Sequence, residues 1–465
     1  MTSGQQRVAV IGGGIAGLAA AHALVRHQKT GEVPEVVVFE RDDRFGGKLL
    51  TTPFAGHPGI DEGADAFLAR IPWATDLARA VGLGDQLVSP NARSAAVWWD
   101  ALHTIPEGLL LGMPTEILAL ARSGLLSWPG KLRAATEPFR RRTSLAPDSL
   151  GHFVRARFGS EVHFRLVDPL VGSIYAADTD HFSLAAVPQI ADVAARGRSV
   201  LITGRRMPKP SPTAGPVFSA PADGMGALAA ATAAAVAAVG GDLRTNISVD
   251  TLVGDGSRWR VNDEHFDAVV LAAPAATASR LLGHEAPNAA AVLAAIPTAD
   301  VAIVTIAVDS REWPARLAGM SGYLVPKPMQ RLVTAASFGS QKWAHWATPG
   351  AVVLRISLGR DGLPVLHLSD EQLLTAALDE VGKHLGFTLQ PLTPEGQHTR
   401  ISRWPAAFPQ YRPHHAAHVA AALQTLPAGL TLAGASYHGI GVPACIRSGQ
   451  QAAAAMHTFL QSVPQ

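Results

Sequence analysis

The sequence predicts an α/β fold with a parallel sheet at its centre, and three observations near the N-terminus carry this prediction. Arg7–Ile11 is a run of mostly branched apolar residues, typical of a buried strand. Gly12, Gly14 and Gly17 follow as GxGxxG, and an alanine-rich stretch typical of a helix comes next. The first glycine allows a tight turn, the second lets a pyrophosphate approach the backbone, and the third allows close helix packing. This order predicts a Rossmann-like nucleotide site.

A second apolar segment typical of a strand, EVVVFE, follows the first in the sequence and ends in Glu40. An acid at this position is placed to accept hydrogen bonds from ribose hydroxyls. The helix that opens at Ile15 and Ala16 offers free N–H groups and a partial positive charge to the phosphates. A structural turn without a nucleotide is the alternative interpretation.

The segment after Glu40, RDDRFGGKLLT, adds a second glycine pair. Arg41 and Arg44 would lie beside the ribose and pyrophosphate, and Gly46–Gly47 allow another close backbone approach. A domain that binds only a nicotinamide dinucleotide has no need of this pair. The combined pattern resembles the FAD-binding flavoproteins of the GG-doublet, amine-oxidase-like type, which implies FAD as the cofactor.

The C-terminal stretch LTLAGASYHGIGVPACI repeats the order of strand, glycine-rich turn and helix. Pro443 suits the first turn of that helix. The helix N-terminus would then stabilise the negative charge of a reduced flavin. Cys445 falls inside the helix and not at the turn, so we expect FAD to be held without a covalent bond.

The resemblance and the coarse pattern predict three interleaved domains. Residues 1–75, 218–285 and 425–465 would form the FAD-binding domain, 76–205 a helical domain, and 286–424 a substrate-binding domain with a mixed sheet. In the helical part, PTEILALARSGLL predicts a short helix with Thr115 as its N-cap. The following WPGKLRAATEPFRRR carries a basic face, interpreted either as solvated or as a contact with an anionic membrane surface or an acidic substrate.

Composition excludes several classes of function. The chain has 465 residues, 48% of them hydrophobic, with a formal net charge of +2, which argues against nucleic acid as a partner. A single cysteine argues against a disulfide framework and favours the cytoplasm. The sequence has no uninterrupted apolar stretch of about eighteen residues, so no transmembrane helix is predicted. Oligomeric state is left open.

Several further segments resemble the oxygen-dependent porphyrinogen oxidases. They are IDEGADAFLAR, IPEGLLLGMPTEILALARSGLLSWPGKLRA, VDPLVGSIYAADTDHFSL, RWPAAFPQY and LAGASYHGIGVPACIRSGQQAA, and they occur in order across nearly the whole chain. The resemblance implies removal of six electrons from a porphyrinogen in three FAD-mediated steps, with O₂ as acceptor and H₂O₂ as product, in haem biosynthesis. The flavin carries this chemistry, so neither a catalytic side chain nor a metal site is expected.

The resemblance also assigns site residues. Those expected at the cofactor are Gly12, Gly14, Ile15, Ala16, Gly17, Glu40, Arg41, Arg44, Gly46, Gly47, Lys48, Gly63, Ala64, Val249, Trp404, Gly434, Gly441, Val442 and Pro443. Gly322 and Leu324, within GMSGYLVP, match the family segment that lines the porphyrin slot. Arg70 is expected either to face a propionate or to be exposed, and Tyr175 either to contact substrate or to lie in the core.

Two substrates fit the resemblance. The alanine- and arginine-rich composition and the PEGLLLGMPT stretch favour coproporphyrinogen III, whereas protoporphyrinogen IX is the alternative. Another amine oxidase or a carotenoid desaturase is less favoured. A binding protein without flavin, similar to the GDP-dissociation inhibitors, represents a different class. A contact with a membrane surface or with another enzyme of the haem pathway also stays open.

Overall fold

A five-stranded parallel sheet carries the N-terminal glycine motif in the computed structural model, which describes residues 5–26, 34–92, 94–207, 215–256, 258–393 and 398–462. The strand order is β12-β2-β1-β16-β22. Their bounds are Arg7–Ile11 (β1), Glu35–Phe39 (β2), Asp242–Arg244 (β12), Ala268–Leu271 (β16) and Leu430–Leu432 (β22). All four ladders are parallel, so the strands' carboxyl ends meet at one edge of the sheet.

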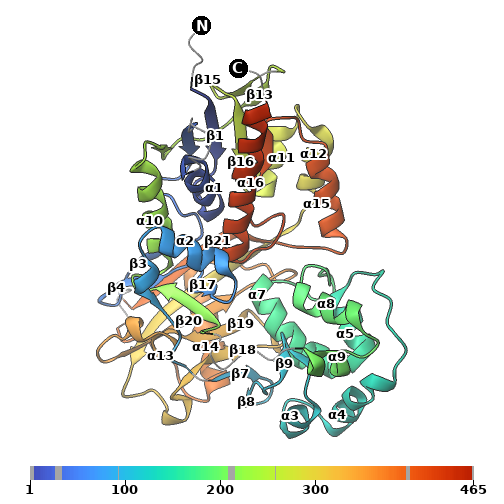
Figure 1. Ribbon diagram of the computed structural model, residues 1–465. Coiled ribbons are helices and arrows are strands. Elements are labelled where there is room, and N and C mark those ends of the chain that lie inside the picture. The colour runs from blue at the N-terminus through green and yellow to red at the C-terminus, as the bar shows by residue number, and fades with distance from the viewer. Residues whose placement is uncertain are drawn as a thin grey trace.

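Helices cover both faces of this sheet, as expected for buried parallel strands. Val8 and Val10 point to one face, where α1 (Ile15–Arg26), α10 (Met225–Ala237) and α16 (Val442–Ser462) pack. Ala9 and Ile11 point to the other face, covered by α11 (Ala275–Leu282), α12 (Pro287–Ala294) and α15 (His415–Gln424). This lobe lies at the top of Figure 1, with both termini at its far end.

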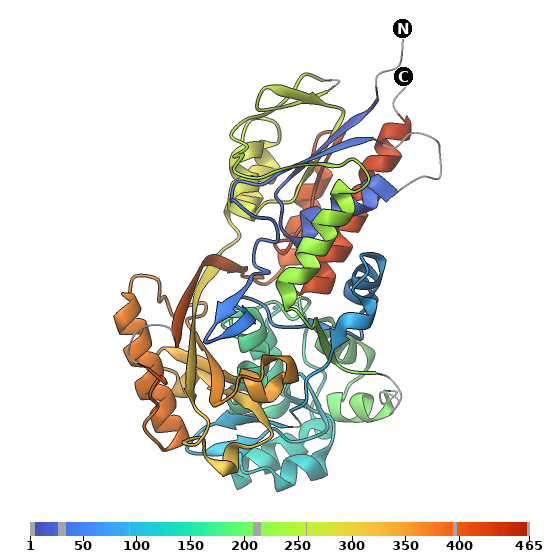
Figure 2. The ribbon, with the colours of Figure 1, turned by 90° about the vertical axis from the view of Figure 1, so that its left-hand side faces the viewer.

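A seven-stranded mixed sheet forms a second lobe below it, with the order β21-β17-β20-β19-β18-β7-β8. The strands are Thr399–Pro409 (β21), Thr298–Asp309 (β17), Ala351–Leu358 (β20), Val333–Phe338 (β19), Met320–Leu324 (β18), Ser94–Trp98 (β7) and Leu102–Thr104 (β8). Helix α14 (Asp370–Leu385) packs on one face through Leu373, Ala377 and Val381. Figure 2 shows α14 on the outer side of the sheet, away from the helical lobe.

The helical lobe packs on the opposite side of that sheet. It contains α3 (Ile117–Arg122), α4 (Trp128–Ala135), α5 (Leu150–Phe158), α6 (Ser160–Val162), the π-helix η3 (His163–Gly172), α7 (Ser173–Tyr175), α8 (Pro188–Arg196) and α9 (Val200–Arg206). The prediction of Thr115 as an N-cap is wrong, because α3 begins after Glu116 without a side-chain cap. The Thr115 hydroxyl donates instead to the Gly108 carbonyl, at 2.7 Å, at the base of the hairpin formed by β9 (Leu109–Leu110) and β10 (Met113–Pro114).

The remaining elements are short. They are α2 (Pro72–Ala80), α13 (Gly339–Lys342), the strands β3 (Thr51–Phe54), β4 (His57–Asp61), β5 (Phe67–Leu68), β6 (Leu87–Val88), β9 (Leu109–Leu110), β10 (Met113–Pro114), β11 (Phe218–Pro221), β13 (Leu252–Gly254), β14 (Trp259–Val261) and β15 (Glu264–Phe266), and the 3₁₀ turns η1 (Gly84–Gln86), η2 (Glu137–Phe139), η4 (Ala315–Leu317), η5 (Lys327–Met329) and η6 (Ala344–Trp346).

The chain passes between lobes several times, so a division into domains is a matter of packing. The five parallel strands fall inside the segments expected for the FAD-binding domain. Helices α12 and α15 lie in the segment expected for the substrate-binding domain but pack on the parallel sheet. Strands β7 and β8 lie in the segment expected to be helical but extend the mixed sheet. We therefore propose a division that assigns α12 and α15 to the FAD-binding domain and β7 and β8 to the substrate-binding domain.

Candidate active site

The two N-terminal glycine motifs lie against each other at the carboxyl edge of the parallel sheet. The Gly46 N–H donates to the Gly13 carbonyl at 2.8 Å, and Gly14 forms a parallel bridge with Gly46. Gly46 has φ +109° and Gly47 φ +56°, conformations that favour glycine. This contact therefore depends on glycine at positions 46 and 47.

The space beside each glycine shows whether that glycine is needed for packing or leaves room for a ligand. We call the open space beside Gly14 and Gly434 the cradle. A Cβ on Gly17 would lie 1.9 Å from the Gly12 carbonyl oxygen, and one on Gly12 would lie 2.8 Å from the Ala272 oxygen. A Cβ on Gly14 would meet nothing within 4 Å, and the same holds at Gly434 near the other end of the chain. Backbone thus lies bare to open space where a pyrophosphate and a flavin are expected, so the chain fits FAD.

Glu40 directly follows β2 and is buried. One carboxylate oxygen accepts from the Gly13 N–H at 2.7 Å, and the other accepts from the Asp42 N–H at 2.9 Å. Each carboxylate oxygen can accept more than one hydrogen bond. Glu40 therefore holds the glycine turn and keeps acceptor capacity for ribose hydroxyls.

The three basic residues expected at the cofactor are placed differently. Arg44 folds back over the glycine pair, and its guanidinium donates to the carbonyls of Gly47, Phe45 and Leu49 at 2.6, 3.3 and 3.4 Å. Arg41 extends into solvent and pairs with Asp42 at 3.5 Å. Arg44 therefore shapes the loop, whereas Arg41 is free to move toward a ligand.

Lys48 lies where the glycine pair meets the seven-stranded sheet. Its Nζ donates to the Ala407 carbonyl at 2.5 Å. The side chain keeps solvent access, yet protein surrounds it on most sides, and this desolvation lowers its pKa.

The C-terminal turn brings the second half of the cradle. Gly434 follows β22 with φ +123°, and its N–H donates to the Ser448 hydroxyl at 3.1 Å. Helix α16 then begins at Val442, with Pro443 in its first turn and Gly441 just before it. Burial raises the pKa of Cys445 to about 11, although nearby Lys48 lowers it, so the thiol stays protonated near neutral pH. These contacts leave the N-terminus of α16 directed at the site and the cysteine packed in the core.

Gly63 and Ala64 lie on a loop that charged side chains anchor to the seven-stranded sheet. Arg355 donates to the Gly63 carbonyl and lies 3.5 Å from the Asp65 carboxylate, while the Lys342 Nζ lies 2.8 Å from it. Burial alone would raise the pKa of Asp65, but the Lys342 and Arg355 cations outweigh it and hold the pKa far below its usual range. The loop is therefore pinned by an ionised carboxylate.

Trp404 and Val249 are the two expected cofactor residues that lie outside the glycine turns. The Trp404 indole N–H donates to the Glu62 carbonyl at 3.1 Å, beside Gly63. Val249 is buried past the end of β12, and Arg280 donates to its carbonyl at 3.2 Å.

Both expected substrate residues of β18 lie on the sheet face that meets this loop. Cross-strand pairing puts Gly322 in one row with Ser337, Arg355, Thr305 and Arg400. Leu324 shares the next row with Ala335, Ser357, Ile303 and Ser402. Paired residues share a face, and on this face Arg355 and Ser402 hold Gly63 and Glu62. The substrate and cofactor residues therefore face a common space.

Arg70 and Tyr175 do not join these rows. Arg70 is exposed in the turn after β5. Tyr175 ends α7, where its ring packs against Phe182 with centroids 4.7 Å apart and its hydroxyl donates to the Ala186 carbonyl at 3.3 Å. Of the two interpretations, the contacts favour exposure for Arg70 and a role in the helical core for Tyr175.

Sequence reasoning missed the anchors of this loop, namely Asp65, Lys342, Arg355 and Arg400. The one local signal was the acidic pattern IDEGAD, which was interpreted only as a family segment. Its cationic partners come from residues nearly 300 positions away, with no motif around them. Within the described ranges, no three His, Cys, Asp or Glu side chains form a group that could hold a metal ion.

Comparison with known proteins follows this geometry. The family model for flavin-containing amine oxidoreductases matches residues 15–457. The chain belongs to this family. It is 34% identical over 448 residues to the coproporphyrinogen III oxidase of Mycobacterium tuberculosis, covering 94% of each chain. It is 29% identical to the coproporphyrinogen III oxidase of Bacillus subtilis, covering 99% of this chain and 100% of the relative.

Among solved structures, a protein from Exiguobacterium sp., provisionally assigned as a protoporphyrinogen oxidase, superposes with a TM-score of 0.85. The match has 28% identity and covers 99% of this chain and 100% of that one. The predicted fold class and the resemblance to porphyrinogen oxidases are confirmed. The family is flavin-containing, so the prediction of FAD as cofactor is confirmed as well.

Proposed function

We propose that this chain oxidises coproporphyrinogen III to coproporphyrin III in haem biosynthesis. The observation that carries the proposal is the full-length similarity to coproporphyrinogen III oxidases from two distant bacteria. The facing arrangement of the FAD cradle and the β18 rows supports it. Loss of six hydrogens from the macrocycle is balanced by reduction of three O₂ to three H₂O₂, with O₂ as the proposed acceptor.

The chain's residues bind and orient in this proposal. Bound FAD supplies hydride acceptance, which no side chain can provide. Gly14 exposes bare backbone to the phosphates, and Glu40 accepts from ribose hydroxyls. Arg355 holds Gly63 against the sheet, so the cofactor loop and the face of Gly322 and Leu324 keep a fixed separation. Orientation of a flat substrate is the main contribution of the protein.

The test compares substrates under oxygen. Purified protein should be yellow, and addition of coproporphyrinogen III should produce porphyrin fluorescence with matching oxygen uptake and peroxide. A slower rate with protoporphyrinogen IX is expected. A faster rate with protoporphyrinogen IX would support the alternative substrate, and no fluorescence with either would favour another amine oxidase or a desaturase. A colourless protein that takes up no FAD would overturn the proposal in favour of a binding protein.

We also propose that the helical lobe rests on an anionic membrane surface. Leu118, Trp128, Leu132 and Phe139 are 75, 78, 69 and 83% exposed. Arg122, Lys131 and Arg140–Arg142 lie on the same segments, whereas Glu137 is buried. Exposed apolar side chains among basic ones suit the interface of anionic lipids. No helix within the described ranges is long and apolar enough to cross a membrane, and the single cysteine favours a cytoplasmic location.

Vesicle sedimentation tests this contact. The protein should sediment with phosphatidylglycerol vesicles but not with phosphatidylcholine vesicles, and 0.5 M salt (roughly a 4 Å screening length) should weaken it. The double variant Trp128→Ser, Phe139→Ser should lose sedimentation and keep its flavin. Absence of the wild-type protein from both pellets would overturn the membrane proposal. Contact with another enzyme would then be the remaining explanation for these exposed apolar residues.

A further inference from the structure

Three segments of the family resemblance meet at Tyr411, a buried residue between β21 and α15. Tyr411 ends the segment RWPAAFPQY. It contacts Phe182 and Ser183 of VDPLVGSIYAADTDHFSL in the helical lobe. It also contacts the turn within LAGASYHGIGVPACIRSGQQAA that precedes α16. Neither the cofactor contacts nor the substrate rows described above include Tyr411.

The Tyr411 hydroxyl closes the turn that precedes α16. It donates to the Ala435 carbonyl, and it accepts from the Gly439 N–H at 2.9 Å. Burial raises the pKa of Tyr411 far above its usual range, so the hydroxyl stays protonated and keeps both hydrogen bonds. The Cys445 thiol lies 3.8 and 3.6 Å from the carbonyls of Gly439 and Ile440 and is only a weak donor. The hydroxyl of Tyr411 therefore makes the stronger side-chain contact with this turn.

The closed turn joins two parts of the chain that are expected at FAD. Gly434, which has open space beside it, directly precedes the turn, and α16 begins at Val442 after it. Tyr437 is buried in the core on one face of the parallel sheet, whereas Ile440 packs against the core of the helical lobe. The position of the α16 N-terminus relative to Gly434 therefore depends on contacts with both lobes.

The helical lobe holds Tyr411 through Phe182 and Ser183. The Ser183 N–H donates to the Tyr411 carbonyl at 2.8 Å. The rings of Phe182 and Tyr411 are nearly parallel, with centroids 6.1 Å apart, and the His415 ring stacks on Tyr411 with centroids 4.1 Å apart. Tyr411 is thus part of the core of the helical lobe, while its hydroxyl bonds the turn beside the cradle.

We propose that Tyr411 is a positioning residue for the flavin: its hydroxyl fixes the turn between Gly434 and α16, and the helical lobe fixes Tyr411. The proposal rests on the proposed function and deepens it with a residue that acts through the turn. A helix N-terminus stabilises nearby negative charge, which reduced flavin carries. Its placement by Tyr411 should therefore affect both the affinity for FAD and the reduction potential of the bound flavin.

Tyr411→Phe tests this role, because it removes the hydroxyl and keeps the ring. Tyr175→Phe is the matched control: the Tyr175 ring also packs on Phe182, but its hydroxyl donates to the Ala186 carbonyl inside the helical lobe. Phe182→Leu is a second variant, which keeps the Tyr411 hydroxyl and removes the ring that packs on Tyr411. Titration of each full-length apoprotein with FAD gives the Kd, and equilibration of the holoenzyme with redox dyes gives the midpoint potential. Tm, kcat and KM are also recorded.

Tyr411→Phe should raise the Kd for FAD about tenfold, the size expected for the loss of one or two hydrogen bonds. The midpoint potential of the bound flavin should become more negative. The kcat with coproporphyrinogen III should fall severalfold, while the KM stays within about twofold of the wild type. Phe182→Leu should change the Kd and the potential in the same direction by a smaller amount, and Tyr175→Phe should match the wild type.

A merely structural role would lower the Tm of Tyr411→Phe and leave the potential of its flavin at the wild-type value, which would overturn the proposal. Equal Kd and potential in Tyr411→Phe and Tyr175→Phe would overturn it too. Loss of all flavin from Tyr411→Phe with a normal Tm would support it. If Tyr411→Phe does not fold, Phe182→Leu decides by the same two measurements. Failure of the proposed function is distinct, because the wild type would then bind FAD but oxidise no porphyrinogen.

Discussion

Individual residues of the cradle divide into those that hold the fold and those that leave room for a ligand. Gly17 is needed for packing, because any Cβ there collides with the Gly12 carbonyl. Gly14 has open space beside it, so its lack of a side chain serves nothing inside the protein. The same motif therefore contains a structural glycine and a ligand-facing glycine, and substitutions should separate them.

Gly14→Asp should abolish FAD binding and leave the apoprotein folded. The new carboxylate enters open space and repels a pyrophosphate, so we expect flavin content to fall at least tenfold with little change in the apoprotein Tm. Absorbance at the flavin band and a thermal melt measure both. In contrast, Gly17→Ala should lower the Tm of the apoprotein. Stoichiometric flavin in Gly14→Asp would contradict the placement of the phosphates.

Because of Asp61, the free energy of unfolding should fall as pH rises. Burial raises its pKa to about 6, although Thr51 and Met225 hydrogen-bond to it. The unfolded value is about 3.9. Protonation of Asp61 therefore stabilises the fold fully below pH ~4, and this contribution, about 3 kcal/mol, is lost as pH rises through about 6. Relative to Asp61→Asn, the wild-type Tm should drop by a few degrees between pH 4.5 and 7.5. If the Tm of the wild type and the Tm of Asp61→Asn changed with pH in the same way, this prediction would be wrong.

Elements of the helical lobe are joined by one buried acid. Glu137 of η2 accepts from the Arg157 Nε of α5 at 2.7 Å. It also accepts from the Ser199 hydroxyl and the Val200 N–H, at 2.6 and 2.9 Å, at the start of α9. A carboxylate is favourable at a helix N-terminus, where backbone N–H groups lack partners. Three elements thus depend on a single side chain.

Glu137→Ala should destabilise the helical lobe by about 3–5 kcal/mol, because Arg157 is left buried without its anion. Ser199→Ala removes only one cap and should cost about 1 kcal/mol. Urea unfolding followed by tryptophan fluorescence compares the two variants. If the two variants lost equal free energy of unfolding, Glu137 would act only as a helix cap.

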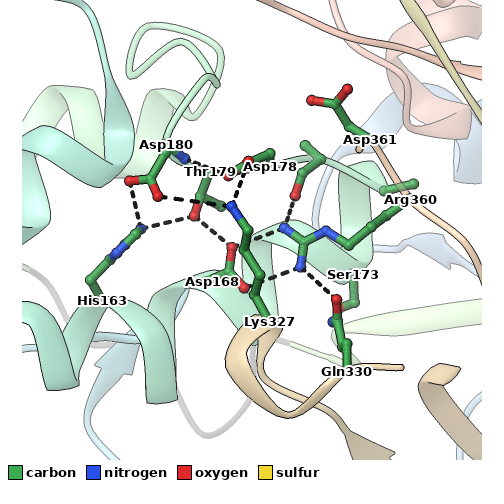
Figure 3. Close-up of polar contacts among 12 residues, drawn as sticks. His163, Asp168, Ser173, Asp178, Thr179, Asp180, Lys327, Gln330, Arg360 and Asp361 are labelled. Carbon is green, nitrogen blue, oxygen red and sulfur yellow. Dashed lines mark hydrogen bonds and ion pairs between the residues drawn. The ribbon is translucent and has the colours of Figure 1, made fainter. Parts of the chain in front are cut away.

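At the scale of the whole molecule, one buried and one partly exposed ion pair connect the helical lobe to the seven-stranded sheet (Figure 3). Arg360 pairs with Asp168, and Lys327 pairs with Asp178. The Asp361 N–H also donates to the Ala176 carbonyl at 2.8 Å. None of these contacts involves the parallel sheet, so we expect the FAD-binding lobe and this junction to respond separately to their loss.

Asp168→Asn should loosen this junction without loss of FAD. Removing one partner of a buried pair typically costs 3–5 kcal/mol, so we expect a lower Tm and a broader melt with normal flavin content. Asp361→Asn, which breaks the more exposed pair with Arg412, is the control and should have a smaller effect. Loss of flavin in Asp168→Asn would show that the junction and the cradle are coupled.

Local patterns predicted the cofactor half well. The strand before Gly12, the acid at Glu40 and Pro443 in the first turn of α16 all occur as expected, because each depends on neighbours in sequence. Thr115 failed as a cap because the β9–β10 turn, not the helix, takes its hydroxyl. The roles of the site residues toward FAD and substrate stay predictions.

The sequence by itself determined the nucleotide turn, the family and the two strands that end in cofactor residues, since short-range backbone geometry specifies them. Only the tertiary structure decided which distant side chains complete the site. Arg355 meets Gly63, Leu324 shares a row with Ser357, and Arg360 pairs with Asp168 of the helical lobe. These relations depend on strand register and on contacts between residues far apart in the chain, which no local pattern encodes.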